Sequence, residues 1–158
     1  PKPAEQFARR LVQTYQYIIQ SRDKKLVPIK EEVDFVKAYM YLLKIRFDES
    51  IVTSINIHES IMSHQIPPLT LQILIENAVK HNFFSKEEPL VVSIDTDQNG
   101  NLIVRNDNRK KEELVDSFKI GLENIRKRYG FFTQEPIRVS DKQVFQVTLP
   151  LIPKSVAA

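Results

Sequence analysis

The chain has 158 residues, 42% of them hydrophobic, and a formal net charge of +3. This length and apolar content are enough for one well-buried domain with at most a small helical extension. The lack of cysteine excludes disulfides, zinc fingers and thiol nucleophiles, and it fits a reducing compartment. The low net charge, with Lys and Arg mixed among Asp and Glu, argues against a nucleic-acid-binding protein.

Glycine is scarce, because Gly100, Gly121 and Gly130 are the only three in the sequence. A Walker loop or a dinucleotide fingerprint needs several glycines in one turn, where the backbone approaches phosphates. The sequence has no such cluster, so a nucleotide would have to be bound in another way. No apolar run reaches the roughly 18–20 residues of a membrane-spanning helix, and we expect the piece to be soluble.

Two amphipathic helices are predicted first, over residues 4–22 and 30–47. In both, apolar residues recur at steps of three and four. They are Phe7, Leu11, Tyr15, Ile18 and Ile19 in the first helix and Val33, Val36, Met40, Leu43 and Phe47 in the second. Such a seam favours a partner helix. Two accounts stay open: packing on the domain's own core, or contact with both the neighbouring helix and another subunit.

The rest of the chain predicts strands mixed with helices. The alternating segments that predict strands are residues 51–57, 90–96, 102–105, 137–139 and 144–149. A third helix is predicted over residues 69–84, and Asn99-Gly100 predicts a tight hairpin turn. A polar loop is expected over residues 106–119, followed by a helix that Gly121 opens and that runs through Arg128.

Polar side chains gather on one side of the third predicted helix. Asn77, Lys80 and His81 are neighbours because their spacing is i, i+3 and i+4, and Glu76 lies at the edge of the same face. Together they can hold a hydrated magnesium ion and the phosphates that it bridges. Magnesium takes few protein oxygens, so one Asn ligand is enough. The alternative is an ordinary solvated face with a Glu76–Lys80 ion pair.

These residues also resemble a known family. Residues 66–72 (IPPLTLQ) and 75–82 (IENAVKHN) resemble the N box of the GHKL ATPase superfamily, in the form found in sensor histidine kinases of the LytS/YpdA (autolysin-sensor) type. Residues 26–32 (LVPIKEE) and 44–47 (KIRF) are similar to the join between dimerisation helices and ATP domain in the same kinases. Residues 120–129 (IGLENIRKRY) resemble their last glycine box and the helix that it caps. The resemblance covers nearly the whole chain.

The resemblance implies an α+β fold of the Bergerat type, an α/β sandwich whose mixed sheet carries helices on one face, preceded by two long helices. It divides the chain into a partial dimerisation segment, residues 1–48, and an ATP-binding catalytic domain, residues 49–158. It implies a protein-histidine kinase fragment that uses ATP and Mg²⁺, with a lid over residues 106–119.

The resemblance also implies roles for the polar face. Asn77 would ligate magnesium, and Glu76 would orient or deprotonate a reacting water or imidazole. Lys80 and His81 would face phosphates or ribose.

Two further positions are implied at the last glycine box. Gly121 and Leu122, at the start of a helix, would offer backbone N–H groups to the phosphates.

The glycine boxes depart from the family pattern. The box that reads adenine appears only as residues 106–109 (NDNR), and Lys119 stands where a glycine usually precedes Ile-Gly-Leu. Asn106 and Asp107 are the candidates for reading adenine, and strand alternation predicts that Asn106 points into the site and Asp107 away. Two glycines are thus missing from the lid hinges, so low nucleotide affinity is expected. The basic residues 109–111 would offset this by meeting phosphate charge, unless they form a solvated basic run.

The phospho-acceptor histidine of the resembled family has no match in this sequence. It lies there in an Asn-Pro-His-Phe-like motif, whereas His58 and His64 fall in predicted loop regions. Phosphoryl transfer requires the acceptor in line with the γ-phosphate, so this piece alone is not expected to phosphorylate itself.

The implied partners are a second copy, through the N-terminal helices, and the receiver domain of a response regulator. The implied location is the cytoplasm, with membrane contact only through segments upstream. A competing hypothesis is a degenerate kinase that acts as a dimerising interaction module with little or no ATP turnover. A GHKL ATPase outside signalling is a more distant third, disfavoured by the long helical lead-in.

Overall fold

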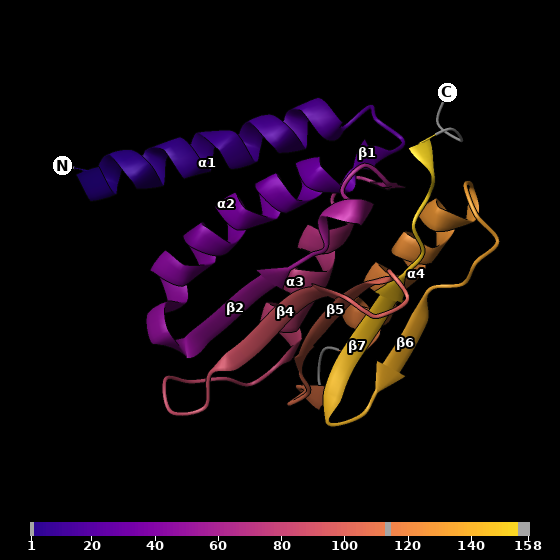
Figure 1. The fold of residues 1–158 in the computed structure, drawn as a ribbon. Helices are drawn as coiled ribbons and strands as arrows, with labels where there is room; N and C mark the ends of the chain where they lie inside the picture. Colours follow the sequence, from indigo (N-terminus) through magenta and orange to yellow (C-terminus); the bar gives the residue numbers. More distant parts are fainter. Residues whose placement is uncertain (1, 113–114, 155–158) are drawn as a thin grey trace.

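The computed structural model describes residues 2–112 and 115–154. The helices follow the chain in the order shown in Figure 1: α1 (Lys2–Ser21), α2 (Ile29–Phe47), α3 (Thr70–His81) and α4 (Val115–Gly130). The strands are β1 (Val27–Pro28), β2 (Ile51–Asn56), β3 (Gln65–Ile66), β4 (Leu90–Thr96), β5 (Leu102–Asp107), β6 (Arg138–Asp141) and β7 (Val144–Leu149). Two 3₁₀ turns, η1 (Asp48–Ser50) and η2 (Glu59–Ile61), flank β2.

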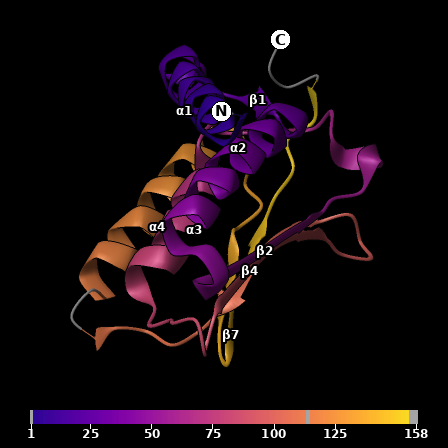
Figure 2. The ribbon, with the colours of Figure 1, turned by 90° about the vertical axis from the view of Figure 1, so that its left-hand side faces the viewer.

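Five strands form one mixed sheet in the order β2-β4-β5-β7-β6. Strands β2 and β4 run parallel, and the other neighbours are antiparallel. Helices α2, α3 and α4 cover one face of this sheet (Figure 2). The short β1 and β3 pair beside the starts of α2 and α3. The predicted α+β architecture, a mixed sheet with helices on one face, is confirmed.

Helix α2 belongs to the core of the sheet domain. Its apolar residues Ile29, Val33 and Val36 are buried in the same cluster as the inward residues of β2, β4 and β5. The domain's own core thus accounts for these three residues, and contact of α2 with another subunit stays a prediction. The division of the chain at residue 48 stays a prediction.

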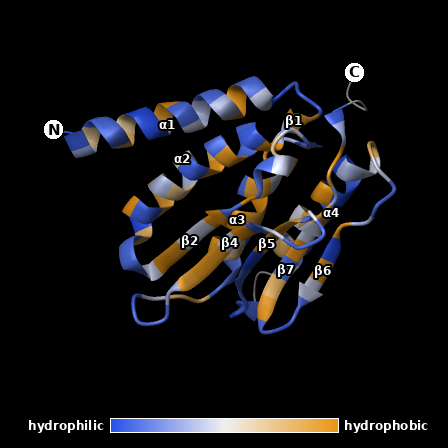
Figure 3. Cartoon of the chain, in the orientation of Figure 1, coloured by the Kyte–Doolittle hydropathy of each residue, from blue (hydrophilic) through white to orange (hydrophobic). Residues whose placement is uncertain are grey.

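Helix α1 lies outside α2, as an added layer (Figure 1). Figure 3 shows that α1 is mostly hydrophilic, whereas apolar residues concentrate on the strands. The buried residues of α1 are Thr14 and Ser21, while Tyr15 and Ile19 of its predicted apolar face are 59% and 68% exposed. None of the described helices combines the length and the apolar character needed to cross a membrane.

The turn between β4 and β5 falls where the sequence predicts it. Gly100 has a φ of +79°, which a glycine adopts without strain. The Asp97 carboxylate closes the turn by accepting from the amides of Asn99 and Asn101, at 2.8 and 2.9 Å.

The start of α4 is the main correction to the predicted elements. The helix begins at Val115, so Gly121 lies inside it instead of opening it. Residues 108–111 are tied to the end of α3, because the amide of Phe83 donates to the Arg109 carbonyl and the amide of Lys111 donates to the His81 carbonyl. The expected mobile loop over residues 106–119 is therefore shorter than predicted, and residues 113–114 lie outside the described part.

Candidate functional site

Helix α3 carries the candidate site and is fixed by its apolar face. Leu71, Leu74, Ile75 and Ala78 are buried against the sheet. Two prolines precede the helix, and its first turn is shaped by Leu69, whose φ of +66° is uncommon for a branched residue. The Thr70 hydroxyl donates to the Pro67 carbonyl at 2.7 Å.

Three of the predicted site residues face α4 from α3. The Asn77 carboxamide lies against Gly121, where an added Cβ would be 2.9 Å from Nδ2. The Lys80 ammonium donates to the Ser117 hydroxyl at 3.1 Å. We call Asn77, Lys80 and His81 the α3 ledge.

The fourth predicted residue, Glu76, is not part of the α3 ledge. Its carboxylate is exposed and accepts a hydrogen bond of 2.6 Å from the Gln72 amide. Burial raises the pKa of Tyr39 on α2, and the negative charge of Glu76 raises it further. Glu76 therefore lies on the α2 side of the helix. The alternative Glu76–Lys80 ion pair is not among the described salt bridges, because each side chain has a different neighbour.

His81 is buried beneath an aromatic side chain of α4. Its ring meets the Phe118 ring edge-on, with centroids 5.6 Å apart. Burial lowers the pKa of His81, and the positive charges of Lys80, Lys111 and Lys110 lower it further. Both ring nitrogens of His81, like Nδ2 of Asn77, are buried with no hydrogen-bond partner among the described residues. Buried polar atoms left in this way are uncommon in proteins, and here three of them gather on the α3 ledge.

Asn106 faces the helix-covered side of the sheet, as strand alternation predicts. It is paired in register with Val92 and Phe145, which are both buried, and its own side chain is buried with them. The Phe145 ring contacts Phe118, with centroids 4.8 Å apart, and the Lys110 ammonium lies over both rings. Asn106 is thus the strand partner of Phe145, and the Phe145 ring is linked to His81 of the α3 ledge through Phe118.

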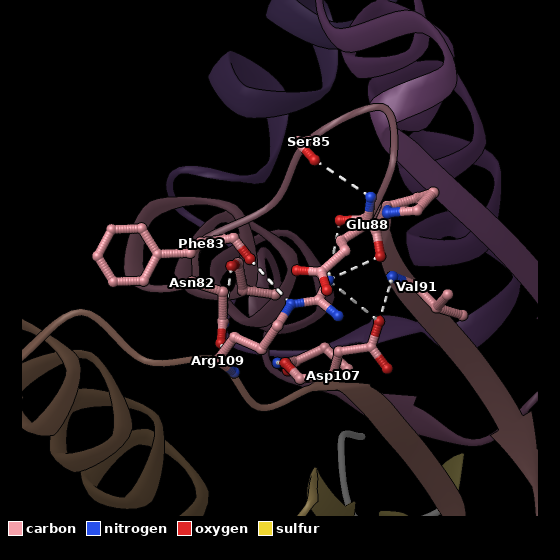
Figure 4. A network of polar contacts seen from close by, with 10 residues as sticks. Asn82, Phe83, Ser85, Glu88, Val91, Asp107 and Arg109 are labelled. Atoms are coloured by element: carbon pink, nitrogen blue, oxygen red, sulfur yellow. Dashed lines mark hydrogen bonds and ion pairs between the residues drawn. The ribbon is translucent and has the colours of Figure 1, made fainter.

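Asp107 points to the opposite face and takes part in a separate polar network (Figure 4). Its carboxylate accepts from the Val91 amide at 2.9 Å and lies 3.6 Å from the Arg109 guanidinium. That guanidinium also donates to the carbonyls of Phe83, Glu88 and Pro89. Arg109 therefore fixes the loop after α3, and the expectation that it meets phosphate charge has no support in these contacts.

The last glycine box is arranged differently from the prediction. Gly121 and Leu122 lie within the second turn of α4, so their amides do not form a free helix N-terminus. Leu122 is buried in the core. Gly121 instead brings the backbone of α4 close to Asn77.

Sequence reasoning missed three residues of this region. Ser117 and Phe118 contact the α3 ledge from a segment that reads as a polar loop, where one aromatic residue among charged ones gives little signal. Asn82 accepts from the Arg109 amide at 2.7 Å and donates to the Ala78 carbonyl at 2.9 Å, so it joins α3 to the segment after β5. Its place as the last residue of the segment that resembles the N box was the available signal.

Comparison with known proteins relates the chain to a family. The histidine kinase family model matches residues 1–51. The chain is 29% identical over 118 residues to the sensor protein LytS of Oceanobacillus iheyensis, covering 71% of this chain. It is 32% identical over 120 residues to the sensor histidine kinase YesM of Bacillus subtilis, covering 72% of this chain. These matches relate the chain to the sensor histidine kinases, LytS and YesM among them.

A solved structure gives the same assignment for the fold. The histidine kinase domain of the blue-light activated histidine kinase EL346 from Erythrobacter litoralis superimposes with a TM-score of 0.57 and covers 98% of this chain and 82% of that one, at 15% identity. The chain spans 20% of the length of the LytS relative and 21% of YesM. The sensor-kinase assignment therefore concerns the family, and the activity of this chain is a separate question.

Proposed function

We propose that the chain binds Mg-ATP between α3 and α4, and that in the intact protein it delivers the γ-phosphate to a histidine on another segment. That phosphate would pass to the receiver domain of a response regulator. The piece would thus be the ATP-binding part of a protein-histidine kinase.

The close approach of Gly121 to Asn77 is the observation that carries this proposal. A side chain at position 121 would place its Cβ 2.9 Å from the Asn77 carboxamide, closer than real Cβ contacts come. Glycine in the interior of a helix costs about 0.5–1 kcal/mol relative to alanine. A glycine at this place, beside a buried amide nitrogen that has no partner in the described residues, fits a site where backbone and carboxamide both approach a ligand.

The neighbouring residues supply the chemistry that phosphates and a purine require. Asn77 would offer its amide oxygen to magnesium, which takes few protein oxygens and keeps several waters. Lys80 would bring positive charge to the phosphates, and Lys110 would do so if it left its ion pair with Asp141. Neutral His81 would donate or accept a hydrogen bond. Asn106 would read the adenine amino group from the sheet, and Glu76 would act from the α2 side of α3.

The contacts of Phe118 favour a second candidate, the dimerising interaction module. Phe118 packs on both His81 and Phe145, so α4 lies closed over the α3 ledge. A degenerate kinase would keep this closed packing permanently, whereas an active one would open it for the nucleotide.

A thermal-shift titration separates the two candidates. A ligand that binds only the folded state stabilises it by RT ln(1 + [L]/Kd). We expect Mg-ATP and an unhydrolysable analogue to raise the midpoint in step with their concentration, and EDTA to reverse most of the shift. An unchanged midpoint at millimolar Mg-ATP would leave the interaction module as the function.

A further inference from the structure

Glu32 is a fully buried carboxylate in the first turn of α2. Buried carboxylates are rare unless they are paired. Its Oε2 accepts hydrogen bonds from the Tyr17 hydroxyl and from the Leu69 amide, the latter at 3.1 Å, and its Oε1 accepts a longer one of 3.4 Å from the Leu71 amide. One side chain of α2 is thereby bonded to α1 and to the start of α3.

The start of α3 depends on this acceptor. The first amides of a helix have no partner within the helix and are usually satisfied by the side chain of the N-cap residue. Here the N-cap residue is Leu69, which offers no side-chain acceptor and adopts a left-handed conformation. Glu32 provides the oxygen atoms from a different helix, and its negative charge suits the positive end of α3.

Tyr17 connects this arrangement to α1. Its ring stacks on the Phe35 ring of α2, with centroids 4.4 Å apart and an interplanar angle of 18°. Burial and the Glu32 charge both raise the pKa of Tyr17, so its hydroxyl stays protonated and acts as the donor.

Besides Tyr17, a second tyrosine joins the two helices: the Tyr41 hydroxyl of α2 donates to the Gln6 side chain at 3.4 Å, and the Arg10 guanidinium lies 5.8 Å from the centroid of the Tyr41 ring. The hydroxyls of Thr14 and Ser21, the buried residues of α1, both donate to carbonyls of α1 itself. Hollows flank the helix: a groove of about 1010 Å³ runs beneath its C-terminal end, and a cavity of about 500 Å³ lies beside its N-terminal half. Tyr17 is therefore a principal attachment of a helix that has room to shift.

The same junction also includes the end of α4. The Arg128 guanidinium donates to the Pro68 carbonyl at 2.6 Å, directly before α3. Burial raises the pKa of Glu32, and the hydrogen bonds from Tyr17, Leu69 and Leu71 together with the positive charge of Arg128 oppose this rise. Near Glu32, the start of α3 is thus bonded to α2 through Glu32, and the end of α4 is bonded to the residue Pro68 that precedes α3.

We propose that Tyr17 and Glu32 are positioning residues that couple the seating of α1 on α2 to the placement of α3. When α1 is seated, the Tyr17 hydroxyl holds the Glu32 carboxylate against the first turn of α3. When α1 shifts, Glu32 loses that donor and the first turn of α3 loosens. Asn77 lies two turns along the same helix and is in tight contact with Gly121, so a small displacement of α3 changes the site; this last step rests on the proposed function.

The first test uses the nucleotide-free chain and needs no ligand. Tyr17→Phe keeps the ring stacked on Phe35 and removes only the hydroxyl. We expect amide hydrogen exchange at Leu69 and Leu71 to become roughly threefold to tenfold faster, because one hydrogen bond in the network is lost. Exchange in β4 and β5 should not change. Tyr15→Phe, on the exposed side of α1, is the matched control and should leave all these rates as they are.

A second variant separates a specific link from general stabilisation. Glu32→Gln removes the charge of the side chain and keeps its shape. When Glu32→Gln and Tyr17→Phe are combined, their effects on the exchange rates of the Leu69 and Leu71 amides should be strongly non-additive. Additive effects, or faster exchange spread evenly over α3, β4 and β5, would show that Tyr17 contributes only to overall stability and would overturn the proposal.

The final test measures the affinity for an unhydrolysable ATP analogue with Mg²⁺. Tyr17→Phe should weaken it about threefold to tenfold while Tyr15→Phe does not, since small misplacements in a site are costly. An unchanged affinity despite loosened α3 amides would contradict the coupling. If the unsubstituted chain binds no nucleotide, the proposed function fails, and the exchange data alone decide whether Tyr17 places α3.

Discussion

Replacing Gly121 with alanine should separate stability from nucleotide binding. The residue lies inside α4, where alanine is favoured over glycine by about 0.5–1 kcal/mol. The new Cβ would be 2.9 Å from Nδ2 and 3.4 Å from Oδ1 of Asn77. The Asn77 carboxamide is the end of a flexible side chain, so it would rotate away at a cost of about 0.5–1.5 kcal/mol for an unfavourable rotamer. The two contributions nearly cancel, and the free energy of unfolding should change by less than about 1 kcal/mol.

Nucleotide binding should respond quite differently to the same substitution. The rotated Asn77 would no longer present its oxygen to magnesium, and we expect the affinity for Mg-ATP to fall about tenfold to a hundredfold, or roughly 1.4–2.8 kcal/mol. Gly130→Ala is the matched control, because a Cβ there has no neighbour within 4 Å. Urea unfolding and isothermal titration calorimetry would measure the two quantities. A Gly121→Ala chain that binds Mg-ATP as tightly as the Gly130→Ala chain would show that the contact between Gly121 and Asn77 does not position the magnesium ligand.

Three further predictions concern adenine reading, pH and self-association. Asn106→Leu should cost about 1–3 kcal/mol of ATP affinity by removing a buried polar contact, whereas Asp107→Asn should leave affinity unchanged in the same calorimetric assay; the reverse result would mean that Asp107 is the reader. The pKa of His81 is lower in the folded chain than the value of about 6.5 that a histidine has in an unfolded chain. The contribution of His81 to the free energy of unfolding should therefore be highest above pH 6.5 and should fall as the pH drops below that value, because the unfolded chain then binds a proton that the folded chain resists. Urea midpoints at pH 5 and pH 7 should therefore differ more in the unsubstituted chain than in His81→Phe, and equal differences would count against this assignment. Ile19→Glu, on the exposed face of α1, should lower the dimer content seen by light scattering without lowering stability, and an unchanged mass would place any dimer contact elsewhere.

Strand positions and the sheet-facing sides of the helices were predictable from local patterns. The alternation in residues 90–96 matches β4, and the spacing of Leu71, Leu74 and Ile75 gives the buried face of α3. Both follow from periodicity, which depends only on neighbouring residues. Periodicity does not identify the partner of an apolar face, so the seam of α2 could not be assigned to the core in advance.

The start of α4 and the role of Glu32 were beyond sequence reasoning for different reasons. Gly121 is predicted at a helix start because glycine is unfavourable in helix interiors. In the structure it lies inside α4, where only a glycine leaves room for Asn77, a residue 44 positions earlier in the sequence. Glu32 reads as an ordinary acidic residue in a first turn. Its burial depends on Tyr17 and Leu69, two distant segments that only the fold brings together.

The most direct test of the account is calorimetry of Mg-ATP binding to the Asn77→Ala chain. Asn124→Ala is the control, because Asn124 is an exposed asparagine on α4. We expect magnesium-dependent binding by the unsubstituted and Asn124→Ala chains. In Asn77→Ala this binding should be lost while the circular dichroism spectrum stays unchanged. Unchanged Mg-ATP affinity in a folded Asn77→Ala chain would contradict the assignment of the α3 ledge as the nucleotide site.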